Sequence, residues 1–212
     1  MTGPRGRAPS GGPAAAEPDV PRSGDDSDPW VDAWLASHAV RGDAQAYETL
    51  VRRHQALVYR VAYRMLGNAS DAEDVTQDVW LQVWASLSSF AGSAAFTTWL
   101  YRIAVNKAIG VARRRYRSVE QLDGEQPAPA AGGRQPAAPS SEDSALAGER
   151  SRAVDAAVAQ LGPDLRAAFV LRHFEDLSYQ DIARVLGVPE ATVRGRLVRS
   201  RRQLMTALGQ WR

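Results

Sequence analysis

Apolar side chains recur three or four residues apart in two parts of the chain, which are separated by a stretch that lacks this pattern. The first part runs from Trp30 to Arg117, interrupted at Gly67 and Gly92, and the second runs from Glu149 to the end. This spacing places the apolar side chains on one face of an α-helix. No alternating segment is long enough to form a β-sheet. The pattern therefore predicts an all-α protein with two small helical domains.

Two segments contain mainly Pro, Gly, Ala and Ser in place of large apolar side chains. Ten of the 12 prolines lie before Val31 or between Pro127 and Pro139. Segments that bury little apolar surface cannot offset the entropy that is lost when the chain is ordered. We therefore predict a disordered tail at residues 1–28, a first helical domain at 29–117, a flexible linker at 118–148 and a second helical domain at 149–212.

The second domain carries the sequence signals of a helix-turn-helix. Ser178, followed three residues later by Asp181, predicts the start of a helix. Gly187 permits the positive φ of a sharp turn, and Pro189 opens a longer helix that runs to about Leu208. Two helices joined by such a short turn form a helix-turn-helix, a motif whose second helix enters the major groove of DNA.

The second helix of this motif is strongly basic. Residues 189–212 contain six arginines and one acid, Glu190, which gives a net charge of +5. Arginine can pair with the O6 and N7 atoms of guanine while its neighbours neutralise phosphates. We expect Arg194 and Arg199 to contact bases and a further set to contact phosphates, namely Thr192, Arg196, Arg201 and Arg202. The alternative is that these arginines only solvate an exposed helix face.

A second basic cluster lies at residues 101–117, which contain six basic residues and no acid. Aromatic residues lie within and beside it, and base stacking combined with phosphate neutralisation is how proteins hold single-stranded DNA. The candidate residues for such binding are Phe96, Trp99, Tyr101, Arg102, Lys107, Arg113 and Arg114. For Trp99, the helical spacing to Leu100 and Ile103 favours a place in the core instead.

Between these regions, Asp71, Asp74 and Asp78 are spaced so that they share one edge of a helix. Ser70 and Glu73 resemble a capping box that would start this helix. Like charges three and four residues apart repel one another, and a basic partner surface would relieve the repulsion. Metal binding is a less favoured alternative, because no His lies near these acids in the sequence. The helix is expected to run to about Leu87 and to bury Val75, Val79, Val83 and Leu87.

The composition excludes several classes of protein. The chain has no Cys, so it contains no disulfide, thiolate metal site or Cys nucleophile. No run approaches the roughly 20 apolar residues of a membrane span, and the N-terminal residues lack the apolar core of a signal peptide. His38, His54 and His173 are scattered and no Gly-rich phosphate loop occurs, so we expect neither an enzyme nor a cofactor. A cytoplasmic, soluble protein is predicted.

Four segments together resemble bacterial RNA polymerase sigma factors, and their two-domain layout resembles the extracytoplasmic-function group. They are GDAQAYETLVRRHQALVYRVAYRMLG, DAEDVTQDVWLQVW, FTTWLYRIAVNKAI and LRHFEDLSYQDIARVLGVPEATVRGRL. The resemblance implies that the first domain binds the polymerase clamp and melts the −10 promoter element. It implies that the second domain binds the −35 element and the polymerase flap, and that an anti-sigma protein sequesters the chain.

The resemblance also assigns individual residues. The clamp-binding motif matches Asp71, Glu73, Asp74, Gln77, Asp78 and Trp84; the −10-binding helix matches Asn106 and Lys107; and the −35-binding helix matches Arg194, Arg196 and Arg199. The chain departs from the family pattern at Val105, Gly110 and Gly195, and its loop at residues 91–95 offers few polar side chains to an extruded base. We expect an alternative sigma factor; a stand-alone helix-turn-helix regulator of duplex operators is the second hypothesis.

Overall fold

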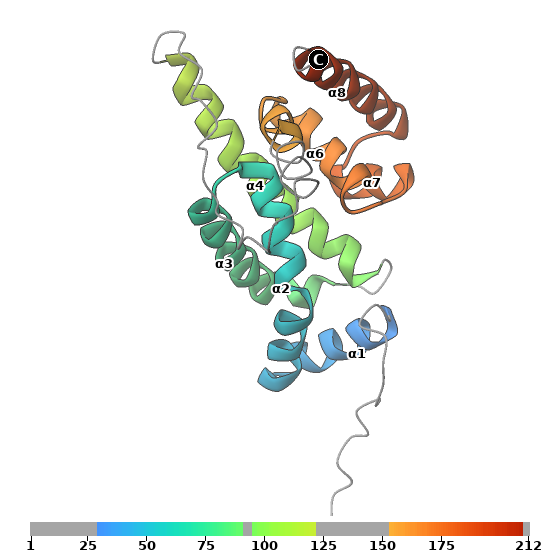
Figure 1. The fold of residues 1–212 in the computed structure, drawn as a ribbon. Coiled ribbons are helices and arrows are strands. Elements are labelled where there is room, and N and C mark those ends of the chain that lie inside the picture. The colour runs from blue at the N-terminus through green and yellow to red at the C-terminus, as the bar shows by residue number, and fades with distance from the viewer. Residues whose placement is uncertain (1–28, 91–94, 122–152, 210–212) are drawn as a thin grey trace, which may run out of the picture.

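The computed structural model describes residues 29–90, 95–121 and 153–209, and within them all regular structure is helical (Figure 1). The helices are α1 (Pro29–Val40), α2 (Ala44–Leu66), α3 (Ala69–Ser86), the 3-10 turn η1 (Leu87–Ser89), α4 (Phe96–Gln121), α6 (Pro163–His173), α7 (Tyr179–Leu186) and α8 (Glu190–Gly209). Residues 153–159 are also helical. The predicted all-α class is confirmed, whereas the predicted tail and most of the predicted linker lie outside the described residues.

Helices α2, α3 and α4 pack against one another, and α1 crosses one end of this bundle (Figure 1). The side chains of α3 that were predicted to be buried, Val75, Val79, Val83 and Leu87, are at most 3% exposed. They meet Leu50, Val58 and Met65 from α2 and Leu100 from α4 in one apolar core. Because α4 remains helical to Gln121, the helix extends four residues beyond the predicted end of the domain at 117.

The start of α3 differs from the prediction. Its N-cap is Asn68, whose side-chain oxygen accepts a hydrogen bond from the backbone N–H of Asp71 at 3.1 Å. Ser70 is already inside the helix, so the predicted capping box of Ser70 and Glu73 is wrong. Gly67 ends α2 in the left-handed region, with φ of 69°, and Asn68 returns to extended backbone. This reversal within two residues lets Asn68 cap a helix that begins at Ala69.

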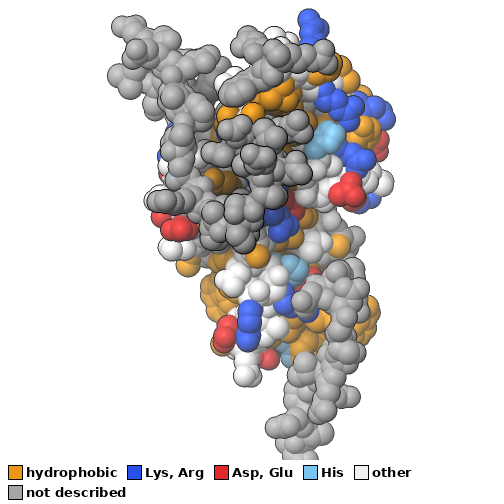
Figure 2. Space-filling view, in the orientation of Figure 1, with side chains coloured by type: hydrophobic (Ala, Val, Ile, Leu, Met, Phe, Trp, Pro, Cys, Tyr) orange, Lys and Arg blue, Asp and Glu red, His pale blue; other side chains and the backbone are white. Residues whose placement is uncertain are grey.

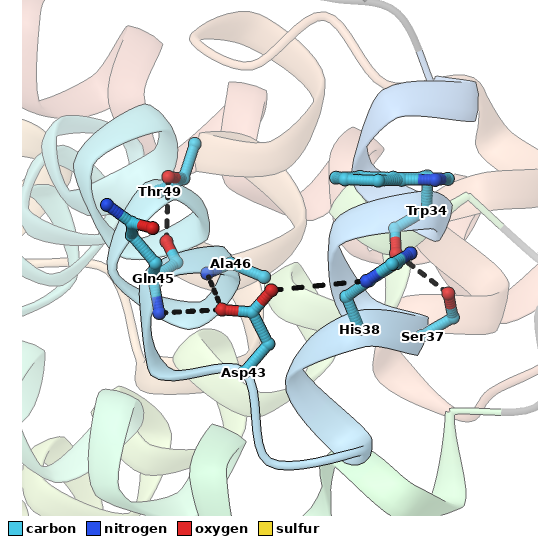
Figure 3. A network of polar contacts seen from close by, with 7 residues as sticks. All are labelled: Trp34, Ser37, His38, Asp43, Gln45, Ala46 and Thr49. Atoms are coloured by element: carbon cyan, nitrogen blue, oxygen red, sulfur yellow. Dashed lines mark hydrogen bonds and ion pairs between the residues drawn. The ribbon is translucent and has the colours of Figure 1, made fainter. Parts of the chain in front are cut away.

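The corner between α1 and α2 is fixed by Asp43, the N-cap of α2 (Figure 3). Its carboxylate accepts hydrogen bonds from the backbone N–H groups of Gln45 at 2.9 Å and Ala46 at 3.0 Å. The other carboxylate oxygen lies 3.9 Å from Nδ1 of His38, at the end of α1, and the His38 ring contacts Trp34 at a centroid distance of 4.0 Å. One side chain therefore caps α2 and also contacts α1.

A buried polar cluster joins α1 to the middle of α2. The Asp32 carboxylate is 2% exposed; one oxygen accepts a hydrogen bond from Nε of Arg53 at 3.0 Å, and the other lies 2.9 Å from Nε2 of His54. A buried carboxylate is stable only when it is paired in this way. The periodicity of α1 gave no sign of this contact, because nothing in the sequence links Asp32 to residues 21 and 22 positions later.

The second domain forms the predicted helix-turn-helix. Pro163 opens α6 and the hydroxyl of Ser178 accepts a hydrogen bond from the N–H of Asp181, capping α7. Gly187 ends α7 with φ of 63°, and α8 begins three residues later. The core of this unit contains Val170, Leu171, Ile182, Val193, Leu197 and Leu204. In Figure 1, this unit lies beside α2 and α4 of the first domain. Helix α6 contacts both α2 and α4, and α7 contacts α4.

Removing the carboxylate of Asp32 tests the buried cluster. We expect Asp32→Ala to lower the free energy of unfolding by about 3 kcal/mol, because it leaves the charged Arg53 and the polar His54 without their carboxylate in the interior. Urea denaturation followed by circular dichroism measures the change. Glu48→Ala is the control, because its ion pair with Arg52 is exposed and its loss should change stability by less than about 0.5 kcal/mol. Equal effects of the two substitutions would contradict this assignment.

Candidate nucleic-acid and protein interfaces

One face of α3 presents acidic, polar and apolar side chains together. The side chains of Asp74, Gln77 and Asp78 are exposed on it, and so are Leu81, at 69%, and Trp84, at 52%. Asp74, Asp78, Leu81 and Trp84 follow one another by three or four residues, and Gln77 lies beside Asp78, so they form a continuous stripe. Glu73 is exposed as well. Leu81 was not selected from the sequence, although its spacing from Asp74 and Asp78 places it on the same edge.

Aromatic contacts hold Trp84 in place. The edge of the Tyr47 ring meets Trp84 at a centroid distance of 4.7 Å and Trp80 at 6.2 Å. The Tyr47 hydroxyl donates a hydrogen bond to the backbone carbonyl of Trp80 at 2.6 Å, which ties α2 to α3. Burial raises the pKa of Tyr47, so this hydroxyl keeps its proton at neutral pH. Trp84 is therefore an exposed ring on a rigid support, which is typical of residues that dominate protein interfaces.

Two of the three aspartates on the acidic edge already have basic partners in α4. Asp71 forms an ion pair with Arg115, and Oδ2 of Asp78 lies 3.3 Å from Nζ of Lys107. The sequence had suggested that an external basic surface would relieve the repulsion between these acids. In the described arrangement α4 supplies that surface for Asp71 and Asp78, whereas Asp74 points outward.

Helix α4 presents a polar and basic face opposite its buried side. Arg102, Asn106, Arg113 and Arg114 are exposed, and Trp99 and Lys107 are half-buried. Trp99 contacts Phe90 and Phe96, with centroids 5.6 and 5.7 Å apart, so one side of its ring belongs to the core. The prediction that Trp99 packs in the core is confirmed for that side of the ring, and its contact with single-stranded DNA stays a prediction.

The structure corrects two of the predicted single-strand contacts. Phe96 is 1% exposed and packs against His54 and Phe90, so its ring is part of the core. Tyr101 is 8% exposed, and its hydroxyl donates a hydrogen bond to Glu175 in the second domain at 2.9 Å. Neither ring can stack on a base in this arrangement. Val105, one of the positions at which the chain departs from the family pattern, is fully buried.

Glu175, in the connection between α6 and α7, places a buried charge at the contact between the domains. Its side chain is 1% exposed and accepts two hydrogen bonds from Arg60 of α2, at 2.8 and 3.1 Å, besides the one from Tyr101. The hydrogen bond with Glu175 raises the pKa of Arg60, and burial, followed by the charge of Glu175, raises that of Tyr101. Both groups therefore remain donors at neutral pH.

Two further arginines reinforce this contact. The guanidinium of Arg64 lies 3.7 Å from the centre of the Phe174 ring, a cation–π arrangement. Arg166 of α6 donates a hydrogen bond to the carbonyl of Met65, near the end of α2, at 2.7 Å, and others to the carbonyls of Ala159 and Leu161. Burial lowers the pKa of Arg166 to about 10, which still leaves it charged at neutral pH.

Asp164, in the first turn of α6, connects the two predicted DNA-binding helices. Its carboxylate accepts hydrogen bonds from Nη2 of Arg113 on α4, at 2.9 and 3.0 Å, and one of its oxygens lies 3.3 Å from Nη2 of Arg196 on α8. Arg196, which was predicted to contact phosphate, has a side chain that is only 17% exposed for this reason. Sequence patterns did not indicate this bridge, which joins residues 51 positions apart.

Helix α8 buries Val193, Leu197 and Leu204, which lie one or two turns apart on one face, and also Ser200. The hydroxyl of Ser200 donates a hydrogen bond to the carbonyl of Leu197, so a polar residue is accommodated in that core. The remaining predicted DNA contacts Arg194, Arg199, Arg201 and Arg202 are exposed, and Thr192 is partly exposed. Figure 2 shows Lys and Arg side chains gathered at the α8 end of the molecule.

Two of these arginines are held by their own helix. Arg194 lies 3.6 Å from Glu190, one turn earlier, and Nε of Arg199 donates a hydrogen bond to the carbonyl of Gly195 at 3.3 Å. No atom lies within 4 Å of the position that a Cβ at Gly195 would take, so this glycine leaves an open notch on the helix surface. In the ranges the structure describes, no group of acids and histidines is placed to hold a metal ion, and no helix is long and apolar enough to cross a membrane.

Comparison with known proteins gives matches for both domains. Residues 50–118 match the family model for Sigma-70 region 2, and residues 151–204 match that for Sigma-70, region 4. The RNA polymerase sigma-H factor of Pseudomonas aeruginosa is 37% identical over 180 residues, which cover 84% of this chain and 93% of that protein. The extracytoplasmic-function (ECF) RNA polymerase sigma-E factor of Escherichia coli is 34% identical over 180 residues, covering 82% and 93%.

Solved structures give the same result. The structure of CnrH in complex with the cytosolic domain of CnrY has a TM-score of 0.61, 28% sequence identity and coverage of 85% of this chain and 98% of that one. The sigma factor RpoE in complex with the anti-sigma factor NepR, from Bartonella quintana, has a TM-score of 0.62, 25% identity and coverage of 78% and 98%. The chain therefore belongs to the sigma-70 family of bacterial RNA polymerase sigma factors, in its extracytoplasmic-function group.

Proposed function

We propose that this chain directs transcription initiation by binding core RNA polymerase through α3 and promoter DNA through α4 and α8. The proposal rests on the exposure of Arg194, Arg199 and Arg202 on α8, which is the second helix of a helix-turn-helix. Such a helix enters the major groove with its N-terminal half facing the base edges. The chain itself catalyses no reaction and needs no cofactor, and it acts in the cytoplasm, where its polymerase is.

The α3 stripe is the proposed contact with the polymerase clamp. Asp74, Gln77 and Asp78 provide charge and hydrogen-bonding groups, and Leu81 and Trp84 provide exposed apolar surface beside them. Protein interfaces combine a central apolar contact with a polar rim in this manner. Electrostatic attraction between the acids and a basic clamp surface would orient the encounter.

The exposed face of α4 is the proposed contact with the unpaired −10 strand. Phe96 belongs to the core, and Tyr101 is covered by Glu175 unless the domains separate. The candidates that are accessible in the described arrangement are the partly exposed Trp99 and the polar side chains Arg102, Asn106, Lys107, Arg113 and Arg114. One partly accessible ring with several cations favours neutralisation of the backbone over stacking on successive bases. The loop residues 91–94 lie outside the described residues.

On α8, Arg194 and Arg199 are the proposed base contacts, and Thr192, Arg201 and Arg202 the proposed phosphate contacts. Arg196 joins them only when its contact with Asp164 is broken. A flap contact by the second domain, and sequestration by an anti-sigma protein, follow from the family. Complexes of relatives with CnrY and NepR support a partner of that kind for this chain.

Promoter binding requires the two domains to separate. Arg113 and Arg196 both lie within 3.3 Å of the same carboxylate, that of Asp164. The −10 and −35 elements are centred about 25 base pairs apart by their names, which corresponds to roughly 85 Å along the duplex at 3.4 Å per base pair. If Arg113 holds one element and Arg196 the other, the described arrangement is therefore a closed form, which binding to the promoter opens.

Charge reversal on α3 tests the polymerase contact. We expect Asp74→Arg to weaken binding to core polymerase by about tenfold, because it places a cation within the acidic stripe. Competition against the unaltered protein for purified core enzyme measures the effect. Glu48→Arg is the matched control, since Glu48 is an exposed acid on α2 outside the stripe. Undiminished binding by the Asp74 variant would remove α3 from the interface.

Removal of one guanidinium from α8 tests recognition of the −35 element. We expect Arg199→Ala to reduce the preference of the holoenzyme for its own −35 sequence by about 1 to 3 kcal/mol, with unchanged binding to core polymerase. Gln203→Ala, an exposed change one turn later, should preserve the preference. Gel shifts with and without polymerase complete the test, because tight, sequence-specific binding by the chain alone would instead support a stand-alone regulator.

Neutralising Asp164 tests the closed form. We expect Asp164→Asn to raise the affinity of the full chain for promoter DNA about two- to fivefold, because Arg113 and Arg196 no longer have to leave a carboxylate. Fluorescence anisotropy with labelled DNA measures this affinity. Asp176→Asn is the control: Asp176 is 96% exposed and pairs only weakly with Arg172, and Asn tolerates its positive φ of 49°. Equal affinities of both variants would contradict the closed form.

A further inference from the structure

Helix α8 carries an exposed apolar side chain within its arginines. Val198 is 63% exposed, although the buried side of α8 is complete without it. It lines a shallow hollow on the helix surface together with Arg201, Arg202, Met205 and Thr206. Val198 therefore faces outward, on the side of α8 that also carries the proposed DNA contacts.

The position of Val198 along α8 places it in the part of the helix that meets base edges. It is the ninth residue of a helix that starts at Glu190, about 12 Å from that end at 1.5 Å per residue. Arg194 precedes it by four residues, and Arg201 and Arg202 follow it by three and four, so all three are its neighbours on the helix surface. Met205 lies about 10 Å further along, in the C-terminal half.

The chemistry of the major groove limits what an aliphatic side chain can contact there. Base edges in this groove present hydrogen-bond donors and acceptors, and the one apolar group is the C5-methyl of thymine. Valine has two methyl groups and a stiff side chain, so it can pack on such a methyl at little entropic cost. The neighbouring arginines would hold the phosphates and bring Val198 against the base pairs.

We propose that Val198 is a specificity residue that recognises the C5-methyl group of one thymine in the −35 element. The proposal rests on the proposed role of α8 and adds a contact that its arginines cannot make, because guanidinium groups recognise guanine and phosphate. It assigns one partner to the exposed valine, and the positive charge of the surrounding arginines favours DNA as that partner. A protein partner would have to bury the same apolar surface beside several cations.

The test removes the methyl group from the DNA and the side chain from the protein. Holoenzyme is assembled from the full chain and core polymerase, and its −35 sequence is selected from a library of duplexes. Each thymine of that sequence is then replaced by deoxyuridine, which lacks only the methyl group. We expect replacement of one particular thymine to weaken DNA binding by the unaltered protein about fourfold, which corresponds to the burial of one methyl group. The same replacement should not change DNA binding by Val198→Ala.

Two control variants make each outcome informative. Met205→Ala removes the other exposed apolar side chain of the hollow and should keep the same dependence on the methyl group. Arg199→Ala should weaken binding whether or not the methyl group is present. Because Val198 is exposed, its substitution should leave the thermal unfolding of the chain unchanged.

Three results would overturn the proposal. The first is a selected −35 sequence without thymine; the second is an equal effect of deoxyuridine on the unaltered protein and on Val198→Ala. The third is a loss of core polymerase binding by Val198→Ala, which would identify the hollow as a protein contact. The proposed function fails separately, if Arg199→Ala and Val198→Ala both bind all sequences as the unaltered protein does.

Discussion

The arrangement of this protein depends on one buried carboxylate. The side chain of Glu175 is 1% exposed, and its charge is stable there because Arg60 donates hydrogen bonds to both of its oxygens and Tyr101 donates one more. A carboxylate in such a place without partners would be strongly destabilising. The connection between α6 and α7 can therefore pack against α2 and α4 in one register, the one that aligns these donors. Phe174 fills the adjacent position under Arg64.

Much of the local structure could be predicted from the sequence because its signals are local. Ser178 begins α7 and Gly187 ends it by means of their own side chain and backbone preferences, and the structure confirms both. The buried stripe of α3 follows from helical periodicity alone. The capping of α3 was wrong because two neighbouring residues, Asn68 and Ser70, can both cap a helix. The backbone reversal at Gly67, where the sequence pattern already has a break, selects the first.

The candidate site could be predicted less well, since a helix face acquires its role from what packs on it. Phe96 and Tyr101 stand beside arginines in the sequence, a pattern typical of single-strand binding, yet both rings are buried. Tyr101 is covered by Glu175, which lies 74 residues later, and Arg60 pairs with a residue 115 positions away. Contacts between residues so far apart in the sequence leave no periodic pattern from which they could be predicted. Leu81 and Val198, in turn, became notable only when their exposure was known.

The solvent exposure of each ion pair determines how easily its two partners can separate. Lys107 and Asp78 have side chains that are 37% and 60% exposed, so water already screens their attraction and either can exchange its partner for DNA or polymerase at little cost. Asp164 is also exposed enough, at 40%, to release Arg113 and Arg196. Glu175 differs, because separating the domains breaks three hydrogen bonds to a buried carboxylate and the contact between Arg64 and Phe174 at once. The described arrangement is therefore loose at its proposed DNA-binding edges and tight at its centre. The energy needed to separate the domains is concentrated where neither DNA nor polymerase is proposed to bind.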